Sequence, residues 1–115
     1  MTALRDRNCR PREGENALDR DAAASYLADT PGWALNDAGT AISRTFRFRN
    51  YYETIAFVNA MAFIVHRQDH HPDLEVGYNR CTVRFSTHSL KGLSENDFIC
   101  AARINALLLR RHESI

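Results

Sequence analysis

Apolar side chains recur every three to four residues between Asn50 and Gln68, which is the longest regular pattern in the chain. This spacing gathers them into one stripe along an α-helix. Asn50 stands before the stripe as an N-cap residue, and Glu53 three positions later resembles the second half of a capping box. The pattern predicts a helix over residues 50–68 with one face packed on a sheet.

Two further helical patterns lie near the ends of the chain. Residues 17–28 are rich in alanine, and Thr30-Pro31-Gly32 after them is typical of a helix end. Ser94 and Asp97 form a helix start of the S-x-x-D kind, and residues 98–110 carry apolar side chains at helical spacing. We therefore expect three helices.

Alternation of apolar and polar residues predicts strands in the segments between the helices. These segments are residues 33–35, 40–48, 74–78 and 80–88. The turn sequence Asn36-Asp37-Ala38-Gly39 joins the first two, so we expect two hairpins. The predicted order is α-β-β-α-β-β-α. This order favours an α+β fold, in which a four-stranded antiparallel sheet has the helices packed on one face.

Chain length and composition fit a single domain. The 115 residues are enough for one modest hydrophobic core. Residues 1–16 are polar, contain Pro11 and Gly14, and show no periodicity. We therefore predict a flexible N-terminal tail over residues 1–16, followed by one domain over residues 17–115.

Charge and cysteine content narrow the classes of function. The formal net charge of +1 gives no electrostatic reason to expect nucleic acid or an anionic membrane as a partner. No apolar run reaches the roughly 20 residues of a membrane span, and residues 1–16 lack the apolar centre of a secretory signal. Three widely spaced cysteines without a CxxC pair favour free thiols. We expect a cytoplasmic protein.

The distribution of histidines is the strongest chemical signal in the sequence. Four of the five lie between residues 66 and 88. His70 and His71 are adjacent in the motif Asp69-His70-His71-Pro72, and His88 ends the fourth predicted strand. Histidine is the side chain whose unperturbed pKa allows proton exchange near neutral pH. We interpret this group as an acid/base site.

A metal site and a nucleic-acid site are the alternatives to this interpretation. His66 and His70 are four residues apart, on one helical face if the helix continues that far, and could bind zinc with Asp69 or Glu75. The absence of HExxH and of a nearby cysteine argues against a metal. The arginines and aromatics of residues 44–51 could stack on single-stranded nucleic acid, but strand alternation explains these aromatics as core.

Several motifs together resemble the pterin-4a-carbinolamine dehydratase family, also called the dimerisation cofactor family. The resemblance covers about residues 18 to 109 and leaves out the arginine-rich start of the chain. The matching strings are Asp69-His70-His71-Pro72-Asp73, Tyr78-Asn79, Val83-Arg84-Phe85-Ser86-Thr87-His88 and Gly92-Leu93-Ser94-Glu95-Asn96-Asp97.

The resemblance implies dehydration of 4a-hydroxytetrahydropterin to quinonoid dihydropterin, in the recycling of the tetrahydropterin used by aromatic amino-acid hydroxylases. It implies histidine acid/base catalysis without a metal, nucleotide or redox cofactor. By position, His70, His71 and His88 match the catalytic histidines, and we expect His70 and His88 to exchange protons while His71 orients the pterin ring. The substrate-binding positions are Asp69, Pro72, Ser86, Thr87 and Ser89.

His66 stands where the family often has a glutamate. A carboxylate would raise the pKa of a neighbouring imidazole, whereas a second imidazole would not. We therefore expect His66 to modulate the proton relay and to shift the pH optimum upward.

The resemblance also bears on partners. Members form dimers and tetramers, so we expect a homo-oligomer with a pterin as its small-molecule ligand and a functional link to a hydroxylase. Some members act as coactivators by binding a homeodomain transcription factor. The alternative function is therefore a non-catalytic protein-binding or coactivator module with the same fold, and a metal-dependent hydrolase is a third.

Overall fold

The computed structural model describes the backbone of residues 2–113 and the side chains of residues 2–108. The elements are η1 (a 3-10 helix, Leu4–Asp6), α1 (Arg20–Leu27), β1 (Ala34–Leu35), β2 (Ile42–Arg47), α2 (Tyr51–Gln68), β3 (Asp73–Val76), β4 (Arg80–Phe85), η2 (a 3-10 helix, His88–Leu90) and α3 (Glu95–Glu113).

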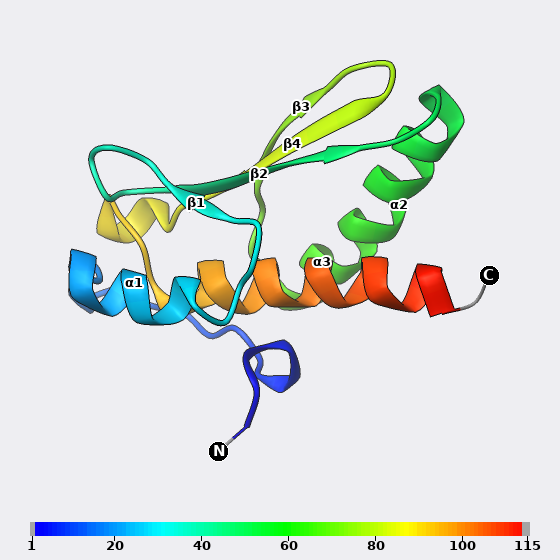
Figure 1. Cartoon of the computed structure of the whole chain (residues 1–115). Helices are drawn as coiled ribbons and strands as arrows, with labels where there is room; N and C mark the ends of the chain where they lie inside the picture. The colour runs from blue at the N-terminus through cyan, green and yellow to red at the C-terminus, as the bar shows by residue number, and fades with distance from the viewer. Residues whose placement is uncertain (1, 114–115) are drawn as a thin grey trace.

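The four strands form one antiparallel sheet in the order β1-β2-β4-β3. Figure 1 shows the three α-helices on one side of this sheet, with α1 beside α3. The predicted α+β fold, with its order of helices and strands, is confirmed.

The hydrophobic core lies between the sheet and the helices. On β4, Cys81, Val83 and Phe85 are fully buried, whereas Arg84 between the last two is exposed. The helices contribute the buried side chains Phe57, Met61, Phe98, Ile99 and Ile104. Burial of each large apolar side chain contributes roughly 1.5–3 kcal/mol relative to exposure. This packing fixes the end of β4, and the residues that follow it, against α3.

The second helix begins at the predicted cap, Asn50, whereas the first begins at Arg20, three residues after its predicted start. The Asp19 side chain accepts a hydrogen bond from the backbone N–H of Ala22, which places the start of α1 at Arg20. Asn50 accepts one from the N–H of Glu53 at 2.9 Å. The Glu53 carboxylate accepts from the N–H of Arg49, one residue before the cap.

Strand β4 ends at Phe85, three residues before the predicted end at His88. After Phe85 the chain turns, because the N–H of Thr87 donates to the carbonyl of Gly92 at 2.7 Å and η2 follows. His88 therefore lies on a short 3-10 helix beyond the strand.

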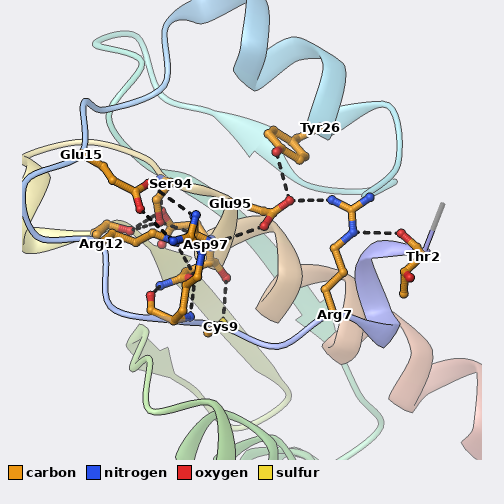
Figure 2. A network of polar contacts seen from close by, with 12 residues as sticks. Thr2, Arg7, Cys9, Arg12, Glu15, Tyr26, Ser94, Glu95 and Asp97 are labelled. Atoms are coloured by element: carbon orange, nitrogen blue, oxygen red, sulfur yellow. Dashed lines mark hydrogen bonds and ion pairs between the residues drawn. The ribbon is translucent and has the colours of Figure 1, made fainter.

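Residues 4–12 depart from the prediction of a flexible tail, because in the structure they lie against α3 (Figure 1). Leu4 is buried in the core. The buried Arg12 guanidinium donates to Asn96 and Glu95, and Arg7 donates to the other oxygen of Glu95 (Figure 2). Arg7 and Arg12, which help to make this segment polar, thus both pair with the Glu95 carboxylate on the first turn of α3. These ion pairs hold a segment that has few apolar residues.

Candidate active site

Asp69 ends α2 and redirects the chain. Its backbone is left-handed, with φ 52° and ψ 45°, a conformation that aspartate tolerates better than most residues. The N–H of Asp69 donates to the carbonyl of His66, and the N–H of His70 donates to that of Val65. This is the Schellman pattern of helix ends. Because the helix stops here, His66 and His70 do not share a helical face.

His70 is held between a buried carboxylate and an aromatic ring. Its Nε2 lies 2.6 Å from Oδ1 of Asp97. Its ring stacks on Phe85, with centroids 5.8 Å apart and planes inclined by 8°. The side chain is only 12% exposed. The orientation of the imidazole is thus fixed from two sides.

Asp97 is fully buried and holds more than the histidine. Its Oδ2 accepts hydrogen bonds from the N–H of Ser94 at 2.9 Å and from the hydroxyl of Thr87 at 2.8 Å. The Ser94 hydroxyl lies 2.7 Å from that of Thr87 and accepts from the N–H of Asn96. Figure 2 shows Asp97 and Ser94 beside the N-terminal segment. Both carboxylate oxygens therefore have partners, as a buried charge requires.

The contact with Asp97 changes the acidity of His70. Burial lowers the pKa of an imidazole, but the hydrogen bond that His70 donates to Asp97 and the negative charge of that carboxylate outweigh this effect. The pKa of His70 is therefore raised above its ordinary value. A histidine with a raised pKa keeps its proton closer to neutral pH and can act there as a general acid.

A pocket of about 380 Å³ opens beside this pair. Its lining comes from residues 9–13, 68–73 and 86–89 together with Asn96. His71 and His88 are both exposed, and they line the pocket with His70. The structure thus brings the three predicted catalytic histidines to one cavity.

The predicted substrate-binding residues also reach the cavity. Its lining includes Asp69, Pro72, Ser86, Thr87 and Ser89. Thr87 differs from the others because it is buried and its hydroxyl binds Asp97, so it positions the carboxylate. The predicted modulating residue, His66, is exposed on the last turn of α2 and is not part of the lining.

Two parts of the site were not predicted from the sequence. Asp97 was interpreted as a helix-start residue and as part of a string that matches the family, but it was given no role in the site. Its S-x-x-D motif is the signal that could have placed a carboxylate near the site. The wall formed by residues 9–13 was assigned to a tail. The buried Arg12 within this wall carries no motif that marks it.

The structure also bears on the alternative sites. Among the side chains that the structure describes, no group of three or more histidine, cysteine, aspartate or glutamate residues is arranged to hold a metal ion. Within the same residues, no helix has the length and apolar character needed to cross a membrane.

Comparison with known proteins gives consistent results. The profile of the family described as Pterin 4 alpha carbinolamine dehydratase matches residues 16–107. A protein of Stenotrophomonas maltophilia (strain K279a), provisionally named a pterin-4-alpha-carbinolamine dehydratase, is 57% identical over 108 residues, which is 93% of each chain. A protein of Xylella fastidiosa (strain 9a5c) with the same provisional name is 54% identical, over 93% of each chain.

Two solved structures share the fold. A transcriptional coactivator/pterin dehydratase from Brucella melitensis has a TM-score of 0.76 and 33% identity, over 80% of this chain and 98% of its own. A pterin dehydratase-like protein described as a RuBisCO assembly factor in the alpha-carboxysome has a TM-score of 0.58 and 25% identity, over 66% of this chain and 88% of its own.

Proposed function

Because the chain belongs to the pterin 4 alpha carbinolamine dehydratase family, we propose that it dehydrates 4a-hydroxytetrahydropterin to quinonoid dihydropterin in the pocket beside His70. The observation that carries this proposal is the 2.6 Å contact between His70 and the buried Asp97, in the wall of a cavity that His71 and His88 also line. An imidazole held in this way is a positioned acid at the edge of a small-molecule site.

The reaction needs two proton transfers. The hydroxyl on C4a takes up a proton and leaves as water, while N5 loses a proton and its electron pair completes the C4a–N5 double bond. His70 has Nε2 engaged with Asp97, so Nδ1 is the nitrogen that would serve the substrate. We assign His70 as the acid for the leaving hydroxyl and His88 as the base for N5. Each positioned transfer contributes about 10²–10⁴-fold.

The remaining pocket residues are proposed to place the ring. His71 is exposed in the lining and would orient the pterin. Asp69, Ser86 and Ser89 offer polar groups for the nitrogen-rich edge of a pterin, and Pro72 offers an apolar surface. Thr87 would act through Asp97, without touching the substrate.

The proposal extends to the metabolic role, the location and the oligomeric state of the protein. The product would re-enter tetrahydropterin recycling beside an aromatic amino-acid hydroxylase, in the cytoplasm. A dimer or tetramer is proposed as well. Its support is β3, which lies at the sheet edge and exposes Leu74 and Val76, since such an edge favours pairing with another strand.

A dehydratase assay tests the proposal. Purified, chelator-treated protein is added to 4a-hydroxytetrahydropterin, and formation of quinonoid dihydropterin is followed by absorbance against the spontaneous rate. We expect acceleration that is lost in His70→Ala and in His88→Ala. His66→Gln is the matched control, because it removes an exposed imidazole outside the pocket lining. It should keep the turnover at its optimum and change only the pH profile.

The alternative is a protein-binding module. Its support is that both solved relatives carry descriptions with a binding role, one as a coactivator and one as an assembly factor. Folded protein that gives no acceleration in the assay would favour this alternative.

A further inference from the structure

Two thiols meet where the N-terminal segment crosses α3. Sγ of Cys9 lies 3.7 Å from Sγ of Cys100, although the residues are 91 positions apart. Cys9 is half-buried and lines the pocket, which gives small molecules access to it. Cys100 is fully buried, one turn after Asp97 on α3. The pair therefore has one accessible sulfur and one shielded sulfur in contact.

The surroundings give the two sulfur atoms different acidities. The hydrogen bond with Cys100 lowers the pKa of Cys9 and outweighs the effect of burial, and the charge of His70 lowers it further. The same contact and burial raise the pKa of Cys100. Since the thiolate is the reactive form of cysteine, Cys9 is the nucleophile of the pair.

We propose that Cys9 and Cys100 form an oxidation site, at which a peroxide converts the two thiols into a disulfide that fastens the N-terminal wall of the pocket to α3. The Cys9 thiolate attacks hydrogen peroxide, and the O–O bond breaks to give a sulfenic acid and hydroxide. Sγ of Cys100 then displaces the hydroxyl group, which leaves as water with the Cys100 proton. The two thiols lose two electrons, and these reduce the peroxide.

The geometry allows this bond with a small movement. A disulfide has an S–S length of about 2.05 Å, so the two sulfur atoms must approach by roughly 1.7 Å. Cys9 lies on an irregular segment that can supply the shift, whereas Cys100 is fixed in α3. The backbone N–H of Cys9 donates to the Gln68 side chain at 2.7 Å. The disulfide would therefore hold this wall at the junction of α2 and α3.

Cys81 provides an internal control. It is fully buried on β4, and burial raises its pKa. It should therefore neither react with peroxide nor exchange into the new disulfide.

The test uses the reduced full-length protein. It is treated with hydrogen peroxide, quenched with catalase, denatured and alkylated, and its intact mass and peptides are measured. We expect a loss of two hydrogens per chain, a linked peptide containing Cys9 and Cys100, and alkylation of Cys81 alone. Cys81→Ser should behave like the wild type in forming the link. Cys100→Ser should leave a sulfenic acid on Cys9 that dimedone traps, and Cys9→Ser should show neither product.

Three results would overturn the proposal. The first is full alkylation of all three cysteines after a peroxide dose that oxidises free cysteine in the same tube. The second is a link that joins two chains. The third is oxidation of Cys9→Ser to the same extent as the wild type. None of these measurements depends on dehydratase activity.

Discussion

Helix α2 begins next to a solvent-exposed arginine, whereas α3 begins inside the molecule, although both have an acidic residue three positions after the cap. At α2, Asn50 caps the helix, and the Glu53 carboxylate pairs with Arg49, whose side chain is 86% exposed. At α3, Ser94 precedes the helix, and the Asp97 carboxylate is 0% exposed. The motif is similar in both places. Only the buried carboxylate can hold a catalytic group away from water.

The difference arises from what surrounds each helix start. The start of α3 lies against the end of β4, where Thr87 donates to Asp97 and Phe85 supports the ring of His70. In a site of low polarity, a carboxylate interacts with an imidazole more strongly than at the surface. A capping carboxylate can therefore also position a catalytic histidine when the sheet shields it from water.

The largest effect is expected for Asp97→Asn. The amide keeps the shape but loses the charge, and its NH₂ group would donate to Nε2 of His70, which reverses the protonation of the ring. We expect turnover in the dehydratase assay to fall by about 10²-fold or more, and the free energy of unfolding to fall by about 2 kcal/mol.

Glu53→Gln makes the same carboxylate-to-amide change at the start of α2. Turnover should equal that of the wild type, because Glu53 lies outside the pocket lining. Equal turnover of Asp97→Asn and Glu53→Gln would contradict the distinction between the two helix starts.

Thr87→Val should have the next largest effect. Valine has nearly the same shape but cannot donate to Oδ2 of Asp97, and the Ser94 hydroxyl also loses a neighbour. Removing one partner of a buried group costs about 1–3 kcal/mol, which chemical denaturation can measure. Turnover should fall by roughly tenfold, since each 1.4 kcal/mol of lost positioning is a factor of ten. A rise in KM alone, with turnover unchanged, would indicate that Thr87 touches the substrate.

The same contrast explains what could be predicted from the sequence. Caps and periodicity are local, so the three helices, the four strands and the group of His70, His71 and His88 were predictable. The contact between His70 and Asp97 spans 27 positions. The His70-His71 motif and the S-x-x-D motif were each recognised, but the sequence does not show that the two are in contact in the fold. The N-terminal wall was not predicted for a different reason. The arginines of residues 1–16 suggested disorder, but in the fold the charge of Arg12 is paired with Glu95, which lies 83 positions away in the sequence.

Asn50→Ala should affect stability without affecting catalysis. Loss of an N-cap side chain costs about 1 kcal/mol. Asn50→Asp should restore most of this loss, because aspartate accepts the same hydrogen bond from Glu53. Thermal unfolding of both variants, alongside the dehydratase assay, checks the prediction. A fall in turnover for Asn50→Ala would show that the start of α2 contributes to the site as well.

The smallest effect is expected in the pH dependence of stability. This dependence should differ between the two helix starts, because only the start of α3 contacts a titrating imidazole. In the folded protein the pKa of His70 is raised, whereas in the unfolded chain it has its ordinary value of about 6.5. The stabilisation from this shift is complete below the unfolded pKa, and it is lost as the pH rises through the folded pKa. The stability difference between the wild type and Asp97→Asn should therefore shrink as the pH rises from below about 6.5 through the raised pKa of His70. The difference for Asn50→Ala should stay constant over the same range, because no imidazole titrates in that cap. If the stability difference from the wild type were equally independent of pH for both variants, Asp97 would stabilise the fold only as a cap.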